Sequence, residues 1–196
     1  MDKIYRKVLD FYKSYLNNVV QILVKEGVHS NIFTFIGFFL CVIFAFLMIA
    51  EGIRQAGAVA LVMALCDIMG TLVSEASNQK QKRSILLESI LDKYSEIIFY
   101  AAIIVTTLQV EYTITALFVF MAFIGTSVYS FIVLKAKQFD MHLDWGYIRR
   151  PERIMLLAVG MFFGFTGLMI SSMIVAVATN AVAVHFIWNI WFDKKD

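Results

Sequence analysis

The stretch IMLLAVGMFFGFTGLMISSMIVAVATNAVAVHFIWNIWF, residues 154–192, has 39 residues and contains no Asp, Glu, Lys or Arg. As a single α-helix it would be about 58 Å long, nearly twice the hydrocarbon core of a bilayer. It therefore predicts two membrane-spanning helices, and we expect a hairpin between them at Gly167–Ser172. Strand-like alternation is absent from the chain, which favours a helical bundle over a β-barrel.

Uncharged runs also occur earlier in the chain, at 32–50 and 112–134, and 60% of all residues are hydrophobic. Only one Pro occurs in 196 residues, which suits long unbroken helices. We therefore predict an all-α membrane protein with six transmembrane helices. The expected spans are 31–50, 55–77, 84–110, 112–136, 151–170 and 173–192. They form one domain, 28–196, which follows an N-terminal segment, 1–27.

The basic residues lie almost entirely on one side of this arrangement. Sixteen of the seventeen Lys and Arg residues lie in four places: the N-terminal segment, the loop after the second span, the loop after the fourth span, and the C-terminus. Each loop is counted together with the start of the helix that follows it. The exception is Arg54. Cytoplasmic loops of membrane proteins carry such an excess. We therefore expect an integral membrane protein, in a prokaryotic plasma membrane, with both termini in the cytoplasm.

Residues 1–27 differ in kind from the spans. Apolar side chains recur at helical spacing among basic and acidic ones, at Ile4, Val8, Phe11, Tyr15, Val19 and Ile22. This pattern predicts an amphipathic helix that lies in the membrane interface. We interpret it as an anchor; admission of a lipid substrate is the alternative.

Several carboxylates lie in the second and third predicted spans. Glu88, Asp92 and Glu96 are four residues apart on one helical face, and Asp67 lies twelve residues into the preceding span. The connection between the spans, 78–83, is short, so we expect the two helices to be antiparallel neighbours. Asp67 and Asp92 would then face each other at similar depth.

Charged groups inside a membrane are costly and usually functional. Oxygen ligands without His or Cys beside them suit hard cations such as Mg²⁺ or Mn²⁺. The carboxylates therefore predict a metal site. The alternative is that they form internal ion pairs with Lys82 or Lys93.

The same residues resemble the signature of the CDP-alcohol phosphatidyltransferase family, D-x2-D-G-x2-A-R-x8-G-x3-D-x3-D. Aligned without a gap, Asp67 stands at the first Asp, Glu88 at the third and Asp92 at the fourth. The flanking sequences LESILDKYSE (87–96), SNIFTFIG (30–37) and RRPER (149–153) are also similar to family motifs. The family has six membrane spans, so the resemblance covers nearly the whole chain.

The chain departs from this signature at several positions. Gly70 replaces the second Asp and Glu75 replaces the Arg. Thr71, Ser74 and Ser84 stand where the family has Gly, Ala and Gly. With Gly70 in place of the second Asp, a two-metal site would lack one of its ligands. With Glu75 in place of the Arg, a hydrogen-bond donor to the substrate would be replaced by a carboxylate.

The resemblance implies residue roles and partners. Asp67, Glu88 and Asp92 would bind Mg²⁺ or Mn²⁺, and Asp92 would also be the catalytic base that takes a proton from the acceptor alcohol. The remaining assignments are nucleotide binding by Thr71, Ser74 and Ser84, and binding of an acceptor phosphate by Arg149, Arg150 and Arg153. We expect a homodimer that works on membrane lipids and a CDP-linked lipid donor, with no nucleic-acid partner.

Two functions remain open at this point. The first is metal-dependent transfer of a phosphatidyl or phospho-alcohol group from a CDP-linked donor to an alcohol, with release of CMP, in phospholipid biosynthesis. The second is a catalytically impaired or non-catalytic relative that keeps the fold and binds lipids or a membrane partner. The arginines before span five have an ordinary explanation too, because basic residues there also serve as a topology signal.

Overall fold

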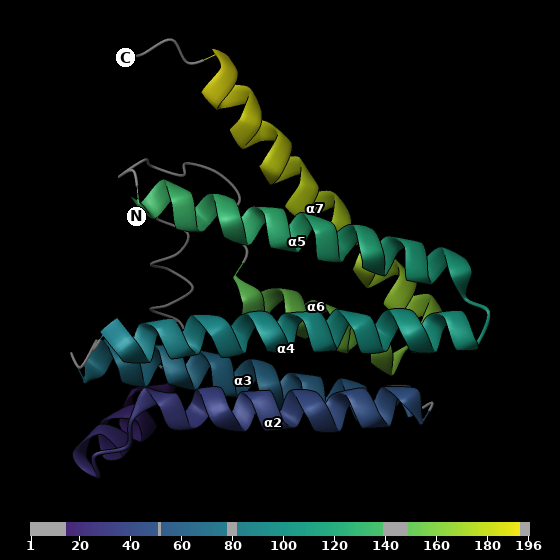
Figure 1. Cartoon of the computed structure of the whole chain (residues 1–196). Coiled ribbons are helices and arrows are strands. Elements are labelled where there is room, and N and C mark those ends of the chain that lie inside the picture. The colour runs from purple at the N-terminus through teal and green to yellow at the C-terminus, as the bar shows by residue number, and fades with distance from the viewer. Residues whose placement is uncertain (1–14, 51, 78–81, 139–148, 193–196) are drawn as a thin grey trace.

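The structure is a computed structural model that describes residues 15–50, 52–77, 82–138 and 149–192. Residues 15–25 form a helix, and six labelled helices follow it (Figure 1). Their bounds are α2 Ser30–Ile49, α3 Ile53–Ala76, α4 Lys82–Gln109, α5 Thr113–Gln138, α6 Arg150–Phe162 and α7 Gly164–Phe192. The predicted all-α fold is confirmed, whereas most of the predicted amphipathic helix lies outside the described residues.

Within the part of the chain that the structure describes, four helices are long and apolar enough to cross a membrane: Ser30–Ile49, Ile53–Ala76, Thr113–Ala136 and Gly164–Trp188. Helix α4 has the length, but its first half carries several charged side chains. Helix α6 has 13 residues, which give about 20 Å of rise against a core of about 30 Å. The count of six spans therefore stays a prediction.

Helix α2 organises the first half of the bundle, because it packs against both α3 and α4. Phe44 of α2 stacks on Phe99 of α4, with ring centroids 4.4 Å apart. On the side toward α3, Gly37 lies beside Asp67, since a Cβ on it would be in ordinary contact with Oδ1 of that carboxylate, 3.5 Å away. Helices α3 and α4 make little direct contact, and our prediction that they pack as neighbours is wrong.

The second half of the bundle is built by α5, α6 and α7. Helix α6 packs on α3 and α7, and α7 also packs along α5 (Figure 1). An interhelical hydrogen bond from Asn180 Nδ2 to the carbonyl of Met121, 3.1 Å long, joins α7 to α5.

The turn between the last two helices is earlier than predicted. It lies at Phe163 and Gly164, where Gly164 has φ +76°, a conformation that favours glycine. The hairpin that we expected at Gly167–Ser172 is therefore wrong. Gly167 belongs to α7 and packs against α6, since a Cβ on it would lie 2.4 Å from the carbonyl oxygen of Gly160. The glycine that looked like a turn residue serves close helix packing instead.

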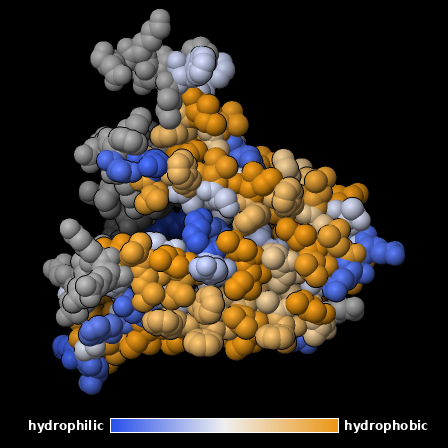
Figure 2. Space-filling view, in the orientation of Figure 1, coloured by the Kyte–Doolittle hydropathy of each residue, from blue (hydrophilic) through white to orange (hydrophobic). Residues whose placement is uncertain are grey.

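Hydrophobic side chains cover the middle of the face shown in Figure 2, and hydrophilic ones gather toward its two ends. Large apolar side chains are exposed on the surface of the bundle, among them Phe46, 69% exposed, and Phe131, 60% exposed. Such a surface suits contact with lipid. Figure 2 also shows a hollow between α4 and α5 that is lined by hydrophilic atoms.

Candidate active site

A cavity of about 190 Å³ lies among α2, α3, α4 and the start of α6. Its lining residues are Thr34, Cys66, Asp67, Gly70, Thr71, Glu88, Asp92, Arg149, Arg150 and Pro151. Three predicted metal ligands, one predicted nucleotide contact and two predicted phosphate-binding arginines thus come together in one place. Residues separated by more than 80 positions in the sequence meet here.

The two aspartates reach the cavity from helices that do not pack on each other. Asp67 projects from the middle of α3, and Asp92 from the third turn of α4. Because α2 contacts both helices, α3 and α4 stand apart and the cavity occupies part of the gap. The predicted meeting of Asp67 and Asp92 is therefore correct, although the predicted reason, direct packing of the two helices, is not.

Arg150, at the start of α6, lies between the two aspartates. Its Nη1 donates a hydrogen bond to Oδ1 of Asp92 and lies 3.4 Å from Oδ2 of Asp67. The Arg150 side chain is 16% exposed, and the Asp67 side chain is 14% exposed. One guanidinium therefore offsets part of the charge of two carboxylates, of which Asp67 is poorly solvated.

A second ion pair lies next to the first and is more deeply buried. Arg153 Nη2 donates to Oε1 of Glu96 over 3.3 Å, and the two side chains are 5% and 6% exposed. Lys93 binds the other oxygen of Glu96, and the Arg153 guanidinium lies 5.6 Å from the centre of the Tyr129 ring. Arg153 is thus enclosed by α4 and α5 and is not among the residues that line the Asp67 cavity.

The predicted ion-pair partners are partly corrected by these contacts. Lys93 pairs with Glu96, as the alternative to a metal site allowed. Asp67 and Asp92 pair with Arg150, a partner that we did not predict. The side chain of Lys82 lies outside the described residues. Sequence patterns gave no sign of the Arg150 contacts, because periodicity relates residues on one helix and not residues 58 positions apart.

The residues predicted to bind the nucleotide separate into two groups. Thr71 lines the cavity, and its hydroxyl donates to the backbone carbonyl of Asp67 at 2.9 Å. Ser74 and Ser84 are not among the lining residues, and the Ser84 hydroxyl donates to Oδ1 of Asn31 on α2. Thr71 is therefore the predicted contact best placed to meet a ligand in this cavity.

Gly70 lines the cavity at the position of the signature's second Asp. A Cβ there would lie 3.2 Å from Cβ of Phe33 on α2, closer than ordinary packing allows. An aspartate at this position would require Phe33 to move by a few tenths of an ångström. Where the family signature has an aspartate, this chain has a glycine that lets α2 pack closely on α3.

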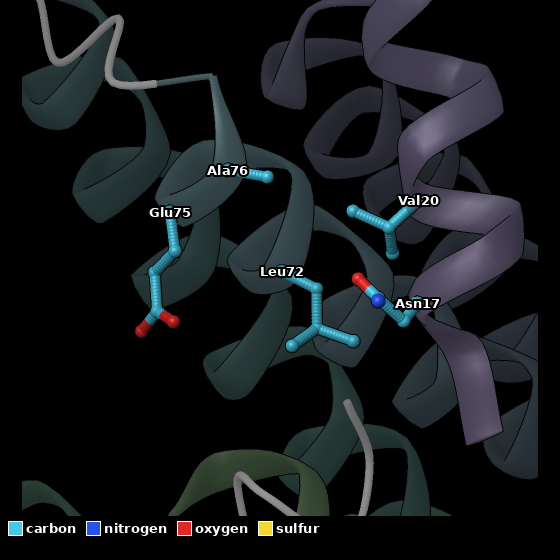
Figure 3. Close-up of a pocket in the computed structure, with 5 residues that line it drawn as sticks. All are labelled: Asn17, Val20, Leu72, Glu75 and Ala76. Atoms are coloured by element: carbon cyan, nitrogen blue, oxygen red, sulfur yellow. The ribbon is translucent and has the colours of Figure 1, made fainter. Parts of the chain in front are cut away.

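Glu75 faces a different cavity from Asp67. Together with Asn17, Val20, Leu72 and Ala76 it lines a space of about 260 Å³ between α3 and the helix of residues 15–25. Figure 3 shows Leu72 pointing toward Asn17, with Glu75 at the other edge. The acid that replaces the family's Arg is therefore not among the residues that line the Asp67 cavity.

A divalent metal does not fit the carboxylates as they lie. Among the residues that the structure describes, no three His, Cys, Asp or Glu side chains are arranged to hold a metal ion. The oxygen ligands have suitable chemistry, but the Arg150 guanidinium already takes the position between Asp67 and Asp92. We therefore derive no step of a reaction through a metal.

Fold and site together define an integral membrane protein with a cavity of mixed charge between its helices. A comparison with protein-family models finds no match. Among curated proteins, the chain is 24% identical over 164 residues to an uncharacterized protein of Aquifex aeolicus (strain VF5), and the match covers 84% of each chain.

The solved structures give a closer likeness in fold. Phosphatidylinositol phosphate synthase (PgsA1) of Mycobacterium tuberculosis, with CDP-DAG bound, matches with a TM-score of 0.72 and 18% identity over 89% of this chain and 92% of that one. The same synthase in complex with manganese and citrate has a TM-score of 0.70 and 19% identity, over 89% and 88% of the two chains. The resemblance predicted from the sequence is therefore confirmed for the fold.

Proposed function

We propose that this chain is a CDP-alcohol phosphatidyltransferase-like membrane protein of phospholipid biosynthesis, and that the Asp67 cavity is its donor site. One observation carries the proposal. Asp67, Glu88 and Asp92, which the signature aligns, line a single cavity with Arg149 and Arg150. The likeness to a synthase whose structure contains CDP-DAG supports a CDP-linked lipid as donor.

The proposed reaction transfers a phosphatidyl or phospho-alcohol group. The acceptor oxygen forms a bond to the β-phosphorus, and the bond from that phosphorus to the oxygen bridging to CMP breaks. CMP leaves with the bridging oxygen, and the proton of the acceptor alcohol passes to Asp92 as general base. Arg149 and Arg150 would bind phosphate oxygens, which arginine does well because its donors are fixed in a planar fork.

Charge limits how this cavity could work. Its lining has three carboxylates against two arginines, so a pyrophosphate would enter a site with a net negative charge. In the family, metal ions supply the missing positive charge, and one related structure contains manganese. Binding of Mg²⁺ or Mn²⁺ by Asp67, Glu88 and Asp92 would require Arg150 to leave the two aspartates.

The contact of Arg150 with both aspartates favours a second candidate function. In this alternative the chain keeps the fold without the chemistry, and it binds a lipid or a membrane partner. The close packing at Gly70, where the signature has its second Asp, supports the same alternative.

CMP release separates the two candidates. Purified full-length protein would be given CDP-diacylglycerol or CDP-archaeol, Mg²⁺ or Mn²⁺, and a panel of acceptors: glycerol phosphate, serine, inositol and inositol phosphate. We expect CMP release that falls about 100-fold or more in Asp92→Asn, because a general base contributes about that much. Glu111→Gln, in the turn between α4 and α5, is the matched control and should keep the activity.

Two other outcomes of this assay would favour the second candidate. One is an absence of CMP with every donor and acceptor. The other is CMP release that Asp92→Asn leaves unchanged, which would exclude this cavity as the reacting site.

The proposal extends to the assembly and placement of the chain. We propose a homodimer, by resemblance to the family, in a prokaryotic plasma membrane with both termini in the cytoplasm. Light scattering in detergent should give a protein mass of two chains, and a mass of one chain in both detergent and nanodiscs would contradict the dimer.

A further inference from the structure

Arg150 lies where a shared cation would have to be. It projects from the start of α6, whereas Asp67 comes from α3 and Asp92 from α4, and its Nη1 atom contacts both carboxylates. Helix α6 packs on α3 and α7. From the start of α6, the Arg150 side chain reaches across the cavity and donates a hydrogen bond to Asp92 on α4. The positive charge between the two aspartates is therefore supplied by a side chain of the protein, Arg150.

Two neighbouring carboxylates, one of them only 14% exposed, are stabilised in their ionised forms by a positive charge between them. A divalent cation could supply it only after losing part of its water shell, which Mg²⁺ does reluctantly. An arginine held in the same chain competes at an effective concentration of the order of millimolar or more. It also stays charged at any accessible pH, so a change of pH does not remove its positive charge from the two aspartates.

We propose that Arg150 takes the place of a divalent cation at Asp67 and Asp92, so that these carboxylates bind metal only when Arg150 is removed. The inference rests on the proposed function for the identity of the site, but it concerns the bound cation and not the reaction. According to this proposal, the native chain holds no divalent metal ion between Asp67 and Asp92. The absence of the signature's second Asp, where this chain has Gly70, agrees with it, because a further carboxylate in the cavity would add negative charge that Arg150 does not offset.

The test is direct measurement of Mn²⁺ binding to the purified full-length protein by electron paramagnetic resonance, without substrate. We expect no saturable Mn²⁺ site in the native chain and a new site in Arg150→Gln that disappears in Arg150→Gln/Asp92→Asn. The new site should bind Mn²⁺ about 10-fold or more tightly than any residual binding to the native chain, because the tethered competitor has been removed.

Arg149→Gln is the matched control for loss of charge. It removes one positive charge from the lining of the same cavity and leaves the Arg150 guanidinium in place. It should gain much less affinity for Mn²⁺ than Arg150→Gln does. Equal gains in the two variants would overturn the proposal, because any loss of positive charge would then suffice.

Other outcomes also overturn the proposal. One is a native chain that binds Mn²⁺ as tightly as Arg150→Gln, and the other is a folded Arg150→Gln that binds none. If Arg150→Gln does not fold, Arg150→Lys replaces it, because a single ammonium is a poorer bridge between two carboxylates. Binding of Mn²⁺ to Arg150→Lys that exceeds native binding supports the proposal, and equal binding contradicts it.

Failure of this proposal and failure of the proposed function give different results. A chain that releases CMP and binds Mn²⁺ at Asp92 without any substitution keeps the proposed function and loses this inference. If the chain releases no CMP but gains a Mn²⁺ site in Arg150→Gln, the proposed function fails and this inference stands.

Discussion

Arg150 and Arg153 are three residues apart on α6, and each is paired with a carboxylate of α4. Asp92, the partner of Arg150, has a side chain that is 40% exposed, and the cavity opens beside it. Glu96, the partner of Arg153, is one turn further along α4 and only 6% exposed. The same two helices thus carry an outer pair that a ligand can reach and an inner pair that is enclosed.

The difference in exposure predicts different roles for the two ion pairs. Removing one partner of an enclosed pair leaves a buried charge without compensation, whereas water replaces much of what an exposed pair loses. The inner pair should therefore matter for folding, and the outer pair for ligands. Substitutions at Glu96, Asp92 and Gly70 test this difference.

The largest effect is expected for Glu96→Gln. It leaves the buried Arg153 guanidinium without its carboxylate, which should cost about 3–5 kcal/mol of stability. Asp92→Asn, the matched change in the outer pair, should cost less, because Asp92 is 40% exposed and Arg150 keeps Asp67 as a partner. Unfolding of both variants in the same detergent by denaturant would measure the two costs. Equal costs would show that the depth of the pairs does not decide their role.

A smaller effect is expected for Gly70→Asp. The new side chain lines the cavity but crowds Phe33 of α2, and overpacking of this kind costs about 1–3 kcal/mol. Gly70→Asp/Phe33→Ala relieves the contact and is the informative comparison, with Phe33→Ala alone as its control. If Gly70→Asp is as stable as the native chain, α2 is not packed on α3 as tightly as the structure indicates.

The comparison between the two pairs also shows what could be predicted for the site. Asp67, Glu88 and Asp92 were found because helical spacing and the signature place them on cavity-facing positions. Arg149 and Arg150 were expected to bind phosphate, and both line the cavity. Arg153 was grouped with them by sequence, yet one further turn of α6 carries it to Glu96.

The turn before α7 gives the corresponding lesson for the fold. Gly160, Gly164 and Gly167 all lie inside one uncharged run, and composition does not distinguish a turn from a packing contact. Only the backbone shows that Gly164 makes the turn, with φ +76°, while Gly160 and Gly167 let α6 and α7 approach each other.

The amino-acid pattern is enough to predict that this chain is helical and lies in a membrane, because uncharged runs of about 20 residues satisfy their backbone hydrogen bonds in lipid only as helices. The same pattern predicts which carboxylates share a helical face. Which cation lies between Asp67 and Asp92 is visible only in the folded chain. That choice depends on how α2 holds α3 and α4 apart and where α6 begins, and contacts between distant segments leave no local periodicity in the sequence.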